Sequence, residues 1–193
     1  MARPESGVGR LAGPGGDPPY WAYVWAGGAV LARHVLERPE TVRGRRVLDL
    51  GAGGGIVAIA AALAGAGHVA ASETDANGRA ALRLNAALNG VALDIRGEDL
   101  LGGPAPEADL VLAGDVFYEP GLALRVLAFL DRCAEAGLEV LVGDPGREPL
   151  PRARLAPVAH YPVRDFGDGP DDPLRVSTVY ALRASTSLDI ASR

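Results

Sequence analysis

The sequence is poor in the residues that build disulfides and metal sites. It has one cysteine, Cys133, among 193 residues, and its three histidines stand far apart. A lone thiol cannot close an intrachain disulfide, and no cluster of His and Cys is present to hold zinc. We therefore expect no metal, and a cytoplasmic protein, since thiols stay reduced in that compartment.

Lysine and glutamine are absent, so all 19 basic side chains are arginine. Together with the abundant alanine and glycine, this composition is typical of a GC-rich genome. The net charge is −5, and the arginines are scattered, with nothing denser than Arg43, Arg45 and Arg46. Because phosphate contacts supply most non-specific affinity for nucleic acid, this charge balance argues against a nucleic-acid partner.

Long apolar runs are also missing. No charge-free stretch approaches the ~18 apolar residues of a membrane helix, and the first 20 residues lack the apolar region of a signal peptide. We expect no membrane partner and a monomer. The Gly-, Pro- and Arg-rich residues 1–18 are interpreted as a flexible tail, residues 19–183 as one domain, and residues 184–193 as a second tail.

Alternating hydrophobic patterns predict an α/β fold. Short buried strands are expected within residues 46–50, 68–75, 92–100, 108–118 and 138–146, and helices within 26–37, 56–67, 77–90 and 122–137. Residues 155–166 and 174–183 are predicted as two further strands with no helix between them. The expected architecture is a Rossmann-like, doubly wound seven-stranded sheet, mostly parallel with a C-terminal antiparallel hairpin.

A glycine-rich loop follows the first strand, in the order Asp49-Leu50-Gly51-Ala52-Gly53-Gly54-Gly55. A dinucleotide fingerprint starting at Gly51 needs glycine at position 56, where Ile56 stands, which weakens a phosphate-binding interpretation. The pattern acidic-x-G-x-G-x-G fits the loop with which class I methyltransferases hold S-adenosylmethionine. Asp49, Gly51, Ala52 and Gly53 are thus candidate cofactor residues; a generic glycine-rich turn is the alternative.

Two further acids follow neighbouring strands. Glu73 comes about 20 residues after the loop, where Rossmann-like sheets place a carboxylate for ribose hydroxyls, and Asp99 follows the third strand. Glu73 with Thr74, and Asp99 with Leu100, are expected to hold the ribose and the adenine. Each acid alone is most often a solvated loop residue, and Asp75 is equally suited to capping the next helix.

Three long segments, residues 47–66, 69–91 and 109–130, resemble the seven-β-strand protein methyltransferases. The resemblance runs from about Pro19 to Tyr180, and within that class it is to the electron transfer flavoprotein β-subunit lysine methyltransferase group, which has bacterial members. Asp115-Val116-Phe117-Tyr118 is similar to the D-x-x-Y motif of the group. Ala26 departs from it, because relatives often carry proline there.

This resemblance implies roles for residues around the motif. Asp115 and Tyr118 would be catalytic, Trp25 and Gly114 would contact the cofactor, and Trp21, Phe117 and Glu119 would contact the substrate. The implied activity is S-adenosylmethionine-dependent N-methylation of lysine side chains in a protein, with the electron transfer flavoprotein β subunit as the candidate. The alternatives are a small-molecule amine, another protein such as a ribosomal protein, or a cofactor-binding module without activity.

Asp17-Pro18-Pro19-Tyr20 resembles the catalytic box of the nucleic-acid amino-methyltransferases. Such a box needs a buried strand to deliver it to the sheet, and the glycine-rich residues before Asp17 do not supply one. The position after the fourth strand is already filled by the motif at Asp115. The tetrapeptide is better interpreted as a bend leading into the aromatic segment at residues 20–28, which we expect to fold over the cofactor and lysine site.

The first prediction concerns Asp115. Its carboxylate would bind and orient the incoming ammonium, so we expect Asp115→Asn to abolish methyl transfer while leaving cofactor binding nearly intact. The measurements are a labelled-methyl assay and calorimetric titration with S-adenosylmethionine. Full activity of the variant would contradict the assignment.

Overall fold

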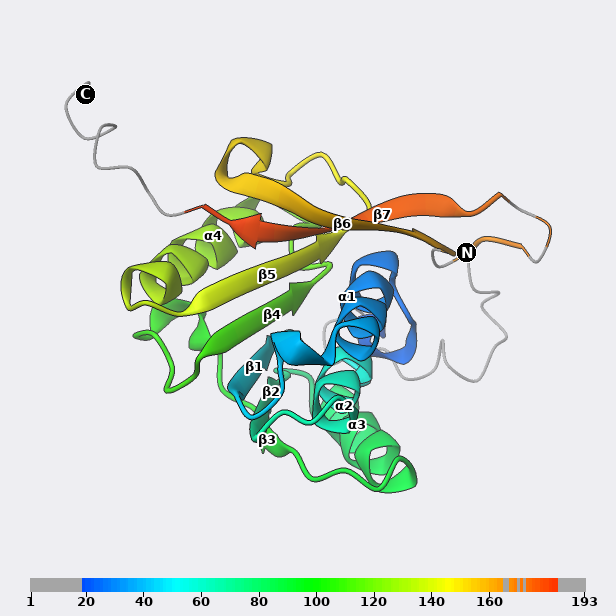
Figure 1. The fold of residues 1–193 in the computed structure, drawn as a ribbon, viewed down its shortest axis with the longest axis vertical. Coiled ribbons are helices and arrows are strands. Elements are labelled where there is room, and N and C mark those ends of the chain that lie inside the picture. The colour runs from blue at the N-terminus through cyan, green and yellow to red at the C-terminus, as the bar shows by residue number, and fades with distance from the viewer. Residues whose placement is uncertain (1–18, 165–166, 170, 172, 184–193) are drawn as a thin grey trace.

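The computed structural model describes residues 19–164, 167–169, 171 and 173–183, so both predicted tails lie outside the described residues (Figure 1). Seven strands form one sheet in the order β3-β2-β1-β4-β5-β7-β6. Their bounds are β1 Arg46–Leu50, β2 His68–Ser72, β3 Asp94–Arg96, β4 Leu110–Gly114, β5 Glu139–Asp144, β6 Leu155–Val163 and β7 Arg175–Leu182.

The sheet is parallel from β3 to β5 and antiparallel from β5 through β7 to β6. The predicted mostly parallel sheet with a C-terminal hairpin is confirmed. The chain moves outward from β1 to β3 and then returns to β4 on the other side of β1. Ligands of open α/β sheets bind at such a reversal, outside the carboxyl ends of the strands.

Helices cover both faces of the sheet (Figure 1). α1 (Ala26–Glu37), α2 (Ile56–Leu63) and α3 (Ala76–Leu88) lie together, and buried side chains of all three belong to one apolar cluster. α4 (Pro120–Glu135) packs on the opposite face, where Phe129 and Leu130 are fully buried in a second cluster. The doubly wound arrangement is therefore confirmed, and α1 has the predicted bounds.

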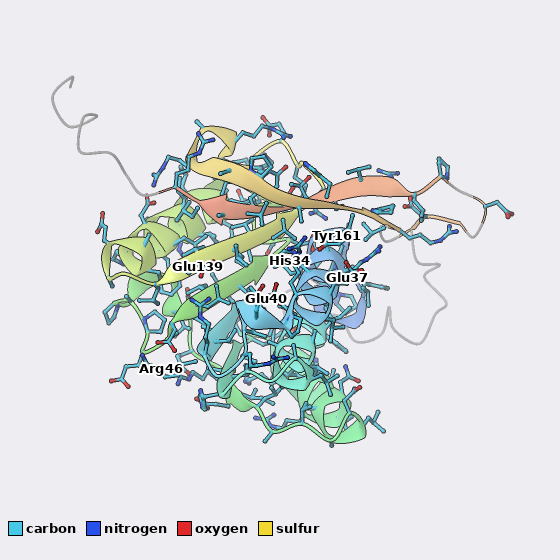
Figure 2. All side chains as sticks on the ribbon, in the orientation of Figure 1. His34, Glu37, Glu40, Arg46, Glu139 and Tyr161 are labelled. Carbon is cyan, nitrogen blue, oxygen red and sulfur yellow. The ribbon has the colours of Figure 1, made fainter. Side chains whose placement is uncertain are left out.

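β3 is shorter than predicted, because only three residues pair with β2. The single-turn 3₁₀ helix Leu100–Gly102 leads from it toward β4, and a similar turn, Arg152–Arg154, precedes β6. The β6–β7 hairpin is tied to α1 by a buried hydrogen bond of 3.0 Å between His34 Nδ1 and the Tyr161 hydroxyl (Figure 2).

Glycines let α1 approach the carboxyl ends of β4 and β5 at backbone contact distance. A Cβ on Gly143 would lie 2.1 Å from the carbonyl oxygen of Gly27, and a Cβ on Gly27 would lie 2.2 Å from that of Gly143. A Cβ on Gly114 would lie 2.8 Å from the Gly28 Cα. Any side chain at these positions would push the first turn of α1 off the sheet.

Gly143→Ala should therefore lower stability. The added methyl meets backbone rather than a movable side chain, and overpacking of this kind costs about 1–3 kcal/mol of unfolding free energy. Gly102→Ala is the matched control, because nothing lies within 4 Å of its Cβ position. Urea unfolding of both variants makes the comparison, and equal stability of the two would contradict the close contact.

Candidate active site

A cleft of about 1520 Å³ opens along the carboxyl edge of the sheet. Its walls come from the loops after β1, β2, β3, β4 and β5, from the aromatic segment before α1, and from residues of α1 and α2. The candidate residues that line it are Trp21, Trp25, Asp49, Gly51, Ala52, Gly53, Glu73, Thr74, Asp99, Leu100, Gly114, Asp115 and Tyr118. The topology thus brings most of the predicted set to one place.

The glycine loop turns sharply between β1 and α2. Gly51, Gly53 and Gly55 have φ values of 71°, 53° and 92°, a left-handed backbone that favours glycine. Asp49, at the start of this turn, is 2% exposed and accepts a hydrogen bond of 2.9 Å from the Ala58 N–H in the first turn of α2. Burial, opposed by the Ala58 N–H and assisted by the nearby Glu73 charge, raises the pKa of Asp49 to about 7.

Glu73 ties the glycine loop to the end of β2. Its Oε2 accepts from the Gly53 N–H at 2.8 Å and its Oε1 accepts from the Asp75 N–H at 2.7 Å. A carboxylate has about four acceptor positions, so each oxygen keeps capacity for a hydroxyl donor. Asp75 instead accepts from the Asn77 and Gly78 N–H groups at the start of α3, and is therefore a helix cap.

Asp99 lies half-exposed after β3. It accepts from the Leu101 N–H at 2.9 Å and pairs with Arg125 of α4. The Leu101 N–H and the Arg125 guanidinium lower the pKa of Asp99, so the carboxylate stays charged. Leu100 lines the cleft beside it.

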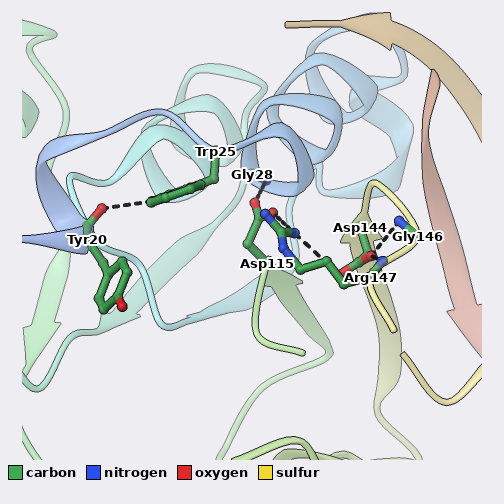
Figure 3. A network of polar contacts seen from close by, with 7 residues as sticks. All are labelled: Tyr20, Trp25, Gly28, Asp115, Asp144, Gly146 and Arg147. Carbon is green, nitrogen blue, oxygen red and sulfur yellow. Dashed lines mark hydrogen bonds and ion pairs between the residues drawn. The ribbon is translucent and has the colours of Figure 1, made fainter. Parts of the chain in front are cut away.

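Asp115 follows β4 with a φ of 58°, and among the described residues it is the one non-glycine with positive φ. Its Oδ2 accepts from the Gly28 N–H at 2.6 Å, and its Oδ1 pairs with Arg147 (Figure 3). Burial raises the pKa of Asp115, while the Arg147 charge and the Gly28 N–H oppose that rise. The carboxylate thus sits between a helix N-terminus and a guanidinium.

Aromatic side chains gather at the mouth of the cleft. Trp25 Nε1 donates to the Tyr20 carbonyl oxygen at 2.9 Å (Figure 3), and the Tyr20 and Tyr118 rings are 5.7 Å apart between centroids. The Trp21 backbone lies over the glycine loop, since a Cβ on Gly54 would come within 3.0 Å of the Trp21 carbonyl oxygen. Tyr118 is 53% exposed, so about half of the residue is accessible to solvent.

Two predicted substrate residues do not line the cleft. Phe117 is fully buried in the apolar cluster under α4, so the prediction that it contacts substrate is wrong. Glu119 accepts from the Gly121 and Leu122 N–H groups and caps α4. These N–H groups lower its pKa, and its carboxylate has a structural role in the helix rather than one in the cleft.

Arg147 and Tyr20 also line the cleft, although neither was among the individually predicted site residues. Arg147 lies in the turn after β5, where Asp144 Oδ1 accepts from its backbone N–H at 2.7 Å and from that of Gly146 at 2.6 Å. In the sequence, Asp144-Pro145-Gly146-Arg147 stands at the end of a predicted strand, a position that suits the substrate groove and an ordinary turn equally well. Nothing local indicates that its guanidinium reaches Asp115.

The described residues hold no group of three or more His, Cys, Asp or Glu side chains suited to a metal. In that same part of the chain no helix has the length and apolarity to cross a membrane.

Comparison with known proteins places the chain in a family. Residues 30–116 match the family described as ribosomal protein L11 methyltransferase. The electron transfer flavoprotein beta subunit lysine methyltransferase of Xenopus laevis is 42% identical over 88% of this chain and 71% of its own length. The chain belongs to this lysine methyltransferase family.

The human family member is 36% identical over 86% of this chain and 65% of its own length. The rat member is 43% identical over 67% of this chain and 51% of its own length. The chain therefore spans about half to seven tenths of the length of these three relatives. Family membership makes S-adenosylmethionine the cofactor.

Solved structures share the fold. The ribosomal protein L11 methylase of Lactobacillus delbrueckii has a TM-score of 0.57 and 23% identity, covering 82% of this chain and 79% of that one. The Pyrococcus abyssi tRNA (uracil-54, C5)-methyltransferase, solved with S-adenosyl-L-homocysteine, has a TM-score of 0.58 and 20% identity. The match covers 80% of this chain and 38% of that one.

Asp49 should make stability depend on pH. Its folded pKa of about 7 lies above the unfolded value of 3.8, so the stability associated with the protonated carboxyl is fully present below pH 3.8 and is lost as pH rises through 7. Asp49→Asn keeps the acceptor for Ala58 but has no charge to bury. Between pH 4 and pH 8, we expect the free energy of unfolding of the variant to rise by up to about 4 kcal/mol relative to that of wild type.

Urea unfolding at both pH values tests this, with Glu98→Gln, an exposed carboxylate, as the control. A stability difference between Asp49→Asn and wild type that stays constant with pH would contradict the assignment of the raised pKa.

Proposed function

We propose that this chain transfers a methyl group from S-adenosylmethionine to lysine side chains of a protein, with the electron transfer flavoprotein β subunit as the candidate substrate. The observation that carries the proposal is the position of Asp115, which lies at the carboxyl end of β4 beside the glycine loop and lines the same cleft. Family membership and the names of the relatives support the protein substrate.

The residues that would hold the cofactor fit its chemistry. Glu73 retains acceptor capacity on both oxygens for ribose hydroxyls, and Asp99 is ionised for a donor such as the adenine amine. The N-terminus of α2 and the glycine loop favour a carboxylate. When bound, the cofactor supplies a methyl group on a positive sulfonium.

The protein's task is to present a neutral amine. A free lysine with a pKa of about 10.4 is neutral only about once in a thousand at pH 7.4. Asp115 would bind the ammonium, orient its nitrogen and hold the proton until it passes to water. Most of the acceleration would come from holding the amine in line with the methyl group.

The aromatic side chains would form the lysine channel. Trp21, Trp25 and Tyr118 border the cleft, and their rings favour a cation within about 6 Å while excluding water. We further propose a bacterial, cytoplasmic monomer that takes no nucleic acid. The resembled group has bacterial members, the one cysteine, Cys133, forms no intrachain disulfide, and the net charge of −5 disfavours nucleic acid.

The test is incubation of the purified protein with labelled S-adenosylmethionine and the electron transfer flavoprotein β subunit of the same source. We expect label on lysines, located by mass spectrometry, and none with Asp115→Asn. This control keeps the backbone, since Asn adopts positive φ more readily than most residues. Label in RNA or in a small amine, and none in protein, would overturn the proposal.

A further inference from the structure

Two buried carboxylates, Asp115 in the cleft lining and Asp144 behind it, share one guanidinium (Figure 3). Arg147 Nη1 pairs with Asp115 Oδ1, and it lies 3.6 Å from Asp144 Oδ2. The Asp144 side chain is fully buried, that of Asp115 is 11% exposed and that of Arg147 is 21% exposed. In the part of the chain that the structure describes, Asp144 Oδ2 has no hydrogen-bond partner.

With both acids ionised, this cluster carries a surplus negative charge. Two carboxylates and one guanidinium sum to −1, and the N-terminus of α1 offsets about half a charge at Asp115. Arg147 is the only charged side chain that contributes to the pKa shift of either acid. Since an uncompensated buried charge is costly, the cluster favours the arrival of a second cation.

We propose that Arg147 is a positioning residue, a displaceable counter-ion that holds Asp115 in the free protein and moves onto Asp144 when the substrate ammonium binds. This inference rests on the proposed function. The arriving ammonium binds Asp115 Oδ1 in place of Arg147. Oδ2 continues to accept the hydrogen bond from the Gly28 N–H, which holds the carboxylate in its orientation.

The displacement is short. A charge-assisted hydrogen bond has a length of about 2.8 Å, so Nη1 need approach Asp144 Oδ2 by less than about 1 Å. The Arg147 backbone does not have to move, because Asp144 Oδ1 holds the turn through the N–H groups of Gly146 and Arg147. Asp144 therefore fixes the turn with one oxygen and offers the other to the guanidinium.

Asp144→Asn tests the exchange. The variant keeps an oxygen for the turn but loses the charge that would receive Arg147, so the guanidinium competes more strongly with the substrate for Asp115. Using the electron transfer flavoprotein β subunit as acceptor, we expect its KM to rise about tenfold with kcat changed less than about threefold. Exposed Glu148→Gln, with the same charge change four residues on, should leave KM unaltered.

The same substitution in an Arg147→Gln background distinguishes this exchange from general damage to the site. With no guanidinium to compete, Asp144→Asn should add no further rise in KM, so the two effects are not additive. The assays are run at a pH well above the acid limb of the kcat/KM profile of each variant, so that Asp115 is ionised in all of them. An undiminished KM rise in the double variant, or an unchanged KM in Asp144→Asn alone, would overturn the proposal.

A titration of the free protein supplies a readout independent of turnover. Arg147 lowers the pKa of Asp115 against the raising effect of burial, and the α1 N-terminus and Asp144 remain beside it in Arg147→Gln. Carboxyl ¹³C NMR should then show a higher Asp115 pKa in Arg147→Gln, and the acid limb of kcat/KM should move up in pH with it. No shift in either would contradict the role of Arg147.

Failure of this inference differs from failure of the proposed function. If wild type labels no lysine, the lysine methylation itself is wrong. If wild type labels lysine while Asp144→Asn behaves as Glu148→Gln does, only the exchange of Arg147 is wrong.

Discussion

The arrangement of the active site depends on one backbone contact, the approach of the first turn of α1 to the ends of β4 and β5. Glycines at positions 27 and 143 allow that approach, and it brings the Gly28 N–H to Asp115 at 2.6 Å. The helix N-terminus then holds a buried carboxylate in a left-handed backbone conformation that would otherwise be strained. The aromatic segment immediately before α1 is positioned over the cleft by the same contact.

Local patterns predicted the fold because its elements are locally determined. The helix at residues 26–37 ends before Pro39, and the parallel strands are short buried runs between glycine-rich turns, so hydrophobic period and turn residues agree. β3 was predicted too long, since half-buried residues at the edge of a sheet resemble the adjoining loop. The hairpin of β6 and β7 followed from two apolar runs with no helical pattern between them.

The site was only partly predictable. Asp49, Glu73, Asp99 and Asp115 could be placed in one cleft because parallel strands end at a common edge. The burial of Phe117 could not be read from its place in a motif, because spacing does not say which face of a turn a side chain takes. Pairings such as Arg147 with Asp115, 32 residues apart, depend on the completed sheet and leave no local signal. Pro120 stands at the first position of α4, where proline is favoured, yet Glu119 before it was predicted to contact substrate.

The cation that faces Asp115 is an arginine, and this choice has a chemical consequence. A protonated guanidinium delocalises its nitrogen lone pairs and is a far weaker nucleophile than a neutral amine, and its pKa keeps it protonated at any physiological pH. A lysine at position 147 would present a nucleophilic amine beside the donor methyl group and would compete as an acceptor in every catalytic cycle. The site can thus carry a resident cation in the substrate's place that is a much poorer methyl acceptor than a lysine would be.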